Sequence, residues 1–293
     1  MKRFNLNKSI GGRLALLTAA LIWGSSFIVL KDAVDNIPIY QLLAIRFTLG
    51  GLLLGVVFRK QLGENLRAIL PHGILCGVLL LAAYAAQTYG LLTTTPGTNA
   101  FLTAVYCVIV PFAAWALFRK PPTVYNWAAA VMCVAGIGLI SLSGDLSIGK
   151  GEWFTLLSGL LYALHIMALS RFGEHDDPIA LTTVQFAVVA VLSWGCSWVF
   201  EPGAALPAPE AWPALLYLTV FATAVTLVLQ SVGQSLTPPN QSAILLSLES
   251  VFAVLFSLLL GREALTPQLA LGFTLVFISV IVSETQLTFL RRK

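Results

Sequence analysis

The chain has 293 residues, of which 58% are apolar and only 10% are charged, and its formal net charge is +4. Soluble domains carry roughly a quarter charged residues, and a chain of this size could not bury so much apolar surface in a soluble core, so the composition excludes an ordinary soluble protein. The mild positive charge is typical of loops beside a membrane and indicates no nucleic-acid partner.

Ten apolar runs follow one another along the chain, and each is long enough to cross a hydrocarbon core of about 30 Å as a helix. They are expected near residues 14–31, 39–58, 70–91, 98–118, 124–143, 152–170, 179–200, 212–232, 241–260 and 267–287. The connections between them are short, which leaves no room for an inserted soluble domain. The sequence therefore predicts an all-α polytopic membrane protein with ten transmembrane helices.

The second half of the chain repeats the first. When the chain is slid along itself until Gln87 meets Gln230, other positions also coincide: Gly90 with Gly233, Thr94 with Thr237, Pro96 with Pro239, and Arg119 with Arg262. A slightly shorter slide pairs Gly12 with Gly151. Because each half holds five predicted spans and five is odd, the second half enters the bilayer upside down. We therefore expect two inverted five-helix repeats, over residues 1–145 and 150–290, as in many secondary transporters.

The distribution of Lys and Arg predicts the orientation in the membrane. Arg46 lies inside a span, only Lys31, Lys150 and Arg262 fall on one side, and all the others fall on the opposite side. Because cytoplasmic loops carry the excess of Lys and Arg, both termini are expected in the cytoplasm. An even number of spans leads to the same conclusion that the termini share one side.

Glu249 is the most informative polar residue inside the predicted membrane region. It lies near the middle of the ninth run, between Leu248 and Ser250. An unpaired carboxylate at that depth is either protonated or faces a wet cavity. Two interpretations are open: Glu249 contacts a substrate or a coupled proton, or it is a neutral, hydrogen-bonded residue that packs helices together.

Two further intramembrane groups are charged or can become charged. Arg46 in the second run could bind an anionic group, but snorkelling toward the surface or pairing with a structural acid is favoured. His165 in the sixth run could sense pH or touch a substrate, or it could be hydrogen-bonded between helices. No catalytic acid pair, His-Glu-x-x-His or Gly-x-Ser-x-Gly pattern occurs, so an enzyme is not expected.

Gln87 and Gln230 are equivalent in the repeat, and the inversion is expected to place one near each mouth of the protein. They could close alternate gates through hydrogen bonds, or they could cap the short hairpins that follow them. Asn99 and Gln241, which lie in or next to those hairpins, could likewise be caps or gate residues.

Other features mark the interior of the spans. The Trp-Gly-Ser-Ser-Phe segment over 23–27 allows close helix approach, and its hydroxyl groups could face a pore. Tyr106 matches Glu249 in the repeat, so the two are expected at symmetric places around one cavity. Pro111 removes a backbone hydrogen bond and should bend the fourth span.

The cysteines give no sign of a metal centre. Cys76, Cys107, Cys133 and Cys196 all lie in apolar runs and lack metal-ligand spacing. We interpret them as small packing residues. No metal and no cofactor is expected.

Several short motifs occur in order along the chain: Trp23-Gly24-Ser25-Ser26-Phe27, Arg46-Phe47, the segment from Phe101 to Pro111, Leu248-Glu249-Ser250-Val251-Phe252-Ala253, and Leu260-Gly261-Arg262-Glu263. With these motifs the chain resembles the drug/metabolite transporter superfamily, specifically its EamA-type ten-span transporters. The resemblance implies two inverted five-helix repeats around a central cavity with alternating access. It also implies a protein of the bacterial inner membrane that exports amino acids, other metabolites or toxic compounds.

The resemblance also implies which side chains lie in or near the cavity. Carried over position by position, they are Trp23, Ser26, Gln87, Tyr106, Tyr162, His165, Gln230 and Glu249. One position departs from the family pattern, because Ser250 stands where a proline usually follows the glutamate. The ninth span is therefore expected to be straighter than in the family.

These observations predict a secondary active transporter that exports a small metabolite or an amino-acid-like compound. No Gly-x-x-x-x-Gly-Lys-Ser/Thr motif occurs, so the driving force is expected to be a substrate gradient or protons carried by Glu249. The expected partners are the small-molecule substrate and the lipid bilayer, with the chain as a monomer or a homodimer. The alternative is a membrane protein that binds or scaffolds without transporting.

Overall fold

The computed structural model describes residues 2–59, 66–119, 121–141, 148–173, 175–237 and 239–287. Its helices are α1 (Lys2–Val34), α2 (Ile39–Val57), α4 (Leu66–Thr93), α5 (Pro96–Ala104), α6 (Tyr106–Phe118), α7 (Val124–Ser141), α8 (Lys150–Phe172), α9 (Pro178–Phe200), α10 (Trp212–Thr219), α11 (Thr226–Leu236), α12 (Pro239–Leu259) and α13 (Pro267–Thr285). A π-helical segment, η2 (Val220–Val225), joins α10 to α11. The described residues contain no β-strand, which confirms the all-α prediction.

Eight helical segments among the described residues are long and apolar enough to cross a membrane. They are Ile10–Val34, Ile39–Val57, Leu66–Thr93, Pro96–Ala116, Lys150–Leu169, Pro178–Phe200, Pro209–Gln234 and Pro267–Thr285. The segments Val124–Ile140 and Leu245–Leu259 are shorter apolar helices, and the end of the expected fifth run, residues 142–143, lies outside the described part. The chain is therefore a multi-pass membrane protein, while ten crossings in two inverted repeats remain a prediction.

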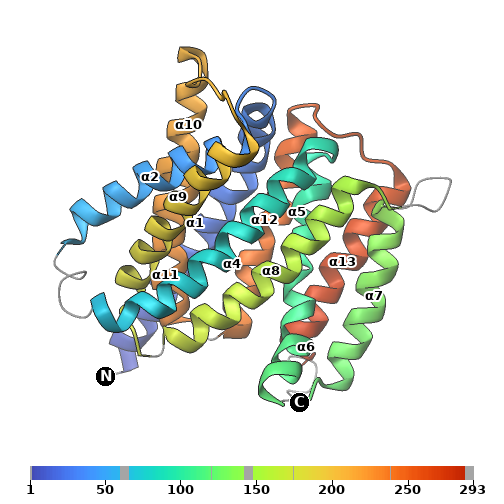
Figure 1. Cartoon of the computed structure of the whole chain (residues 1–293). Helices are drawn as coiled ribbons and strands as arrows, with labels where there is room; N and C mark the ends of the chain where they lie inside the picture. Colours follow the sequence, from blue (N-terminus) through green and yellow to red (C-terminus); the bar gives the residue numbers. More distant parts are fainter. Residues whose placement is uncertain are drawn as a thin grey trace.

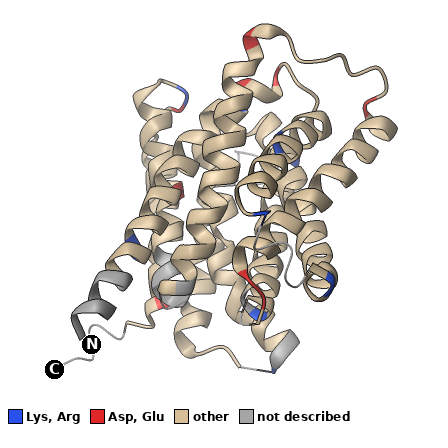
Figure 2. Cartoon of the chain, turned by 90° about the vertical axis from the view of Figure 1, so that its left-hand side faces the viewer, with Lys and Arg blue, Asp and Glu red and all other residues tan. Residues whose placement is uncertain are grey.

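The charged residues follow the pattern that a bilayer demands. Figure 2 shows most Lys, Arg, Asp and Glu toward the two ends of the helices, with few in the middle. Charged side chains are costly in hydrocarbon, so the few in the middle need partners or a wet cavity. We call the end of the bundle where α1 begins the N-terminal face; the connection between α12 and α13 lies at the opposite face (Figure 1).

Helices from the two halves of the chain pack directly against one another. α1 packs against α11 and α12, α2 against α9, α4 against α8 and α9, and α7 against α13. Figure 1 shows α4 beside α8 and α7 beside α13. The interior is therefore shared by both halves, and residues far apart in sequence come together there.

Two of these crossings are close because each helix contributes a glycine. A Cβ on Gly12 of α1 would lie 3.3 Å from the Gly233 carbonyl oxygen, and one on Gly233 would lie 3.1 Å from the Gly12 oxygen. In the same way, a Cβ on Gly90 of α4 would lie 2.8 Å from the Gly151 carbonyl oxygen. One on Gly151 of α8 would lie 2.9 Å from the Gly90 oxygen. Small residues of this kind let membrane helices approach closely.

Replacing Gly90 with Ala is expected to destabilise the protein by about 1–3 kcal/mol, because the new methyl group has no room at this crossing. The added Cβ would contact the Thr155 hydroxyl and the Gly151 backbone. Thermal unfolding in detergent measures the effect. Gly55→Ala is the matched control, since no atom of the described residues lies within 4 Å of a Cβ there. A Gly90→Ala protein as stable as the control would contradict the close crossing.

Two irregular turns interrupt the spans. The fourth span is divided at Val105, whose carbonyl oxygen accepts hydrogen bonds from the Val108 and Ile109 amides at 2.9 and 3.1 Å. The sequence predicted a bend at Pro111, but Pro111 lies inside α6, beyond this division. In the eighth span, the π-helical turn η2 lies between α10 and α11. Such turns are frequent at functional sites, and both border the cavity described next.

Candidate functional site

A cavity lies between helices of both halves. Its lining comes from α1, α2, α4, α5, α6, α8, η2, α11 and α12. All eight residues that the resemblance implied line this one cavity: Trp23, Ser26, Gln87, Tyr106, Tyr162, His165, Gln230 and Glu249. The structure therefore brings the whole set together, while their roles in binding or gating remain predictions.

Gln87 is held between neighbouring helices by its side-chain amide. Its Nε2 donates to Thr103 Oγ1 at 3.1 Å, and its Oε1 accepts from the Tyr162 hydroxyl at 3.1 Å. The amide is thus directed at α5 and α8 and does not cap the hairpin that follows α4. Gln230 lines the same cavity, so the two equivalent glutamines share one space, and their places near opposite mouths stay a prediction.

Glu249 faces the cavity from α12. The residue is only 7% exposed, and among the described residues its carboxylate has neither a hydrogen bond nor an ion pair. No contact within the described part of the chain therefore supports the interpretation of Glu249 as a hydrogen-bonded packing residue. A carboxylate in this position is available to a ligand or a proton that enters the cavity.

The sequence did not single out three other polar residues as cavity residues. Arg46, for which a structural role was favoured, lines the cavity together with Tyr84 and Thr103. Tyr84 lies three residues before Gln87 and therefore on the same face of α4, a spacing that could have identified it. For Arg46 the signal was its charge inside a span, which left anion binding open, while the neighbours that hold it at this wall come from distant segments.

The π-helical turn positions two cavity residues. The Trp23 indole nitrogen donates to the Ala222 carbonyl oxygen at 3.0 Å. Thr223 donates its hydroxyl hydrogen to the Leu218 carbonyl oxygen at 2.7 Å and accepts hydrogen bonds from Arg46. The irregular backbone of η2 thus holds side chains from α1 and α2 against the cavity. Ser26 instead donates to the Trp23 carbonyl oxygen of its own helix at 2.8 Å.

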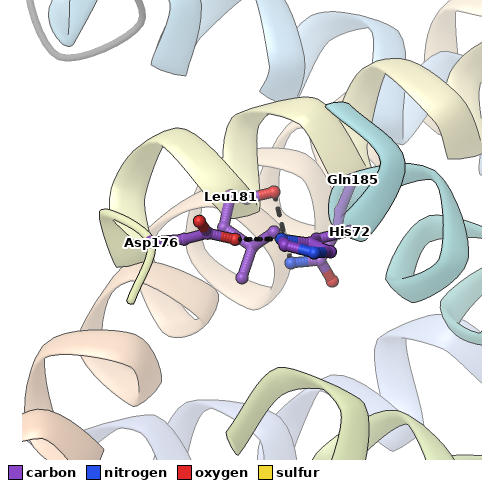
Figure 3. Close-up of polar contacts among 4 residues, drawn as sticks. All are labelled: His72, Asp176, Leu181 and Gln185. Atoms are coloured by element: carbon purple, nitrogen blue, oxygen red, sulfur yellow. Dashed lines mark hydrogen bonds and ion pairs between the residues drawn. The ribbon is translucent and has the colours of Figure 1, made fainter. Parts of the chain in front are cut away.

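His165 has one ring nitrogen engaged in a contact between α8 and α9. Its Nε2 lies 2.7 Å from Gln185 Oε1, and because an amide oxygen can only accept, Nε2 carries the hydrogen. Gln185 in turn donates to the Leu181 carbonyl oxygen at 3.3 Å, as Figure 3 shows. The contact supports the interhelical interpretation of His165, and its place on the cavity wall leaves a substrate contact open.

A second histidine contact lies near the N-terminal face and was not predicted. His72 Nδ1 at the start of α4 lies 2.7 Å from Asp176 Oδ2, in the connection between α8 and α9 (Figure 3). The imidazole also stacks on Phe172, with ring centroids 4.1 Å apart. This pair ties the first half to the second outside the cavity.

The hairpin between α4 and α5 is fixed by Asn99 and capped by Thr95. Thr95 Oγ1 accepts from the Thr98 amide at 3.2 Å, so Thr95 is the cap and Asn99 is not. The fully buried Asn99 donates to Thr155 Oγ1 at 2.8 Å and to the Gln87 carbonyl oxygen at 3.2 Å. It joins α4, α5 and α8. The side chain of Gln241, its counterpart in the prediction, lies outside the described residues.

At the opposite face, the connection between α12 and α13 is bonded to α1 and α5. Arg262 Nη2 lies 3.0 Å from both oxygens of Asp32, near the end of α1. Glu263 Oε1 accepts from Thr95 Oγ1 at 2.6 Å and from Thr98 Oγ1 at 3.3 Å, at the start of α5. We call these five residues the opposite-face cluster. Within the described part of the chain, no group of three or more His, Cys, Asp or Glu residues could hold a metal ion.

Known proteins resemble the chain along almost its whole length. It is 30% identical over 275 residues to an uncharacterized transporter of Archaeoglobus fulgidus, which covers 94% of this chain and 86% of that protein. It is 26% identical to the uncharacterized inner membrane transporter YedA of Escherichia coli (strain K12), covering 92% of this chain and 89% of that protein. A crystal structure of a protein with 18% identity superposes with a TM-score of 0.70 over 95% of this chain and 98% of that one, which shows the fold alone.

The family itself is shown by a family model. The model of the EamA-like transporter family matches residues 10–142 and 149–285. These two segments include every described residue that lines the cavity. The resemblance inferred from the sequence motifs is confirmed, and the chain belongs to the EamA-like transporter family.

Proposed function

We propose that this protein is a secondary active transporter that exports a small metabolite, or an amino-acid-like compound, across the bacterial inner membrane by alternating access. One observation carries the proposal: in a member of a transporter family, polar and aromatic side chains from both halves converge on one cavity inside a bundle of membrane helices. Intramembrane polar groups are costly and mark substrate or ion pathways.

The helix packing supports two inverted repeats, over residues 1–145 and 150–290, as the basis of alternating access. Gly12 corresponds to Gly151 and Gly90 to Gly233 in the sequence repeat. One close crossing joins Gly12 to Gly233, and the other joins Gly151 to Gly90. The repeat therefore maps the first crossing onto the second, as a two-fold axis between the halves would. The packing of α2 on α9 and of α7 on α13 is likewise what a two-fold relation between the repeats requires. Inverted repeats that rock around a fixed site give each side access in turn.

The proposal also covers the orientation in the membrane, the energy source and the partners. The excess of Lys and Arg on the side of the termini supports a cytoplasmic location for both ends. The energy would come from the substrate gradient or from protons that bind Glu249. The protein would act as a monomer or a homodimer and would need only its substrate and the bilayer.

Overexpression in a bacterial host tests the function. Cells that express the wild type, Glu249→Gln or an empty vector are compared by profiling small molecules in the medium. We expect one or a few compounds to accumulate only with the wild type. Identical profiles at equal amounts of membrane-inserted protein would contradict export.

The competing function is a membrane protein that binds or scaffolds without transport. It predicts ligand binding without movement of the ligand across the bilayer. A channel is a third candidate and predicts flux that does not saturate, whereas a carrier is limited by conformational steps on the microsecond-to-second timescale. Flux into liposomes separates all three.

A further inference from the structure

Arg46 is a buried cation whose bonds to the protein are incomplete. It lies on α2, is 2% exposed and lines the cavity. Its Nε and Nη2 both donate to the same hydroxyl oxygen, Thr223 Oγ1, at 3.3 and 2.8 Å. Its guanidinium carbon lies 5.4 Å from the centre of the Tyr84 ring. Its Nη1 is buried, and no described residue forms a hydrogen bond with it.

The buried positive charge of Arg46 favours an anionic partner. A guanidinium does not lose its proton in proteins, so Arg46 cannot escape its burial by becoming neutral. A hydroxyl and an aromatic face are neutral partners and compensate the charge only in part. Among the described residues, no carboxylate lies within ion-pair distance of Arg46. Of the two structural roles that the sequence favoured, snorkelling and pairing with an acid, the acid pair is therefore not found among the described residues. Arg46 lines the cavity with an Nη1 that no described residue bonds.

The other charge on the cavity wall limits the kind of anion. Glu249 lines the same cavity, so a dianion such as a phosphate group would meet repulsion from its carboxylate. A carboxylate carries one charge and matches the planar donors of a guanidinium. A substrate with a positive group as well could place that group toward Glu249. The aromatic rings of Trp23, Tyr84 and Tyr162 would cover its apolar part.

We propose that Arg46 binds the carboxylate of the transported compound through Nη1, so that a carboxylate is a requirement for recognition. The inference rests on the proposed function, because it names the substrate class of the same cavity. It gives Arg46 a binding role in place of the structural one. An inorganic anion such as chloride shares the charge but not the planar geometry.

Ligand-induced stabilisation of the purified, full-length protein tests the inference. The probes are the standard L-amino acids and simple monocarboxylic acids, each paired with its own carboxamide, and sodium chloride. A ligand that binds only the folded state raises the unfolding temperature. We expect at least one carboxylate to raise it and its amide to bind about tenfold to a hundredfold more weakly, as for a lost hydrogen bond to a charged group.

Variants show whether Arg46 is the group responsible. Arg46→Gln is expected to lose the response to the carboxylate, and Arg46→Lys to keep part of it. The exposed Arg13→Gln removes the same charge away from the cavity and should respond like the wild type. The comparison of acid and amide on the wild type needs no variant, so it stands even where Arg46→Gln does not fold.

Four results would overturn the inference: an amide that stabilises as strongly as its acid, a normal response of folded Arg46→Gln, chloride alone producing the full effect, or no response to any carboxylate. Failure of the transport proposal looks different. Arg46-dependent binding without flux in liposomes would leave the inference standing and remove the transporter. Normal transport of a compound without a carboxylate would leave the transporter proposal standing and remove the carboxylate requirement.

Discussion

Replacing Glu249 with Gln is expected to lower proton-driven export about tenfold or more, because the amide keeps the shape of the side chain but can neither ionise nor exchange a proton. Glu249 faces the cavity, and no described residue bonds its carboxylate. If protons enter as substrate leaves, a more acidic exterior speeds export by the wild type. The Gln variant should show no such acceleration.

Flux in proteoliposomes at equal and at opposed internal and external pH measures this effect. Glu210→Gln is a suitable control, since Glu210 is exposed in the short turn before α10. Wild-type transport that ignores the pH gradient, together with full activity of Glu249→Gln, would remove Glu249 from the coupling mechanism. If transport by the wild type and by Glu249→Gln depended equally on the pH gradient, the coupled proton would be assigned to another group.

Replacing Glu263 with Gln is expected to loosen the opposite face and to cost about 1–3 kcal/mol of stability, because a charged acceptor of two hydroxyl groups is lost at the start of α5. Gly97→Ala should have the same effect. A Cβ on Gly97 would contact the Glu263 carboxylate and would lie 2.8 Å from Val254 Cγ2. Replacing glycine with alanine inside a helix otherwise stabilises a protein, so a loss of stability for Gly97→Ala identifies the contact.

The two substitutions act on one contact, so their effects should not add. A double-mutant cycle on thermal unfolding tests this, with Gly55→Ala as the matched glycine control. Because α5 leads directly to Thr103 and then to Tyr106 in the cavity, both variants are also expected to change the apparent affinity for substrate. Additive losses, or a Gly97→Ala protein that gains stability like an ordinary helical alanine, would contradict the role of this cluster.

Much of the architecture could be predicted because the bilayer leaves few choices. A run of apolar residues of sufficient length must form its own backbone hydrogen bonds, so the helices follow from composition and length alone. The family resemblance implied the set of cavity residues, and polarity independently singled out some of them. Polar groups such as Gln87, His165 and Glu249 are expensive in the membrane, and the structure places all three on one cavity.

The contacts that could not be predicted all depend on the packing of distant segments. Arg46 reaches the cavity because η2 presents the Thr223 hydroxyl to it, and nothing local to α2 reveals that neighbour. The division of the fourth span at Val105 and the π-helical turn are responses to tertiary packing that propensity does not encode. His72 and Asp176 meet because α4 packs on α8 and α9, and neither segment reveals that contact by itself.

Solute counterflow in proteoliposomes tests the central claim most directly. Vesicles that contain the purified wild type are loaded with the compound that the export profile identifies, and uptake of a trace of the labelled compound is followed. A carrier with alternating access is expected to show a transient accumulation of label that saturates with concentration and is lost when the interior is empty. Label that never enters, or that enters equally with and without internal compound and without saturation, would contradict alternating access through this cavity.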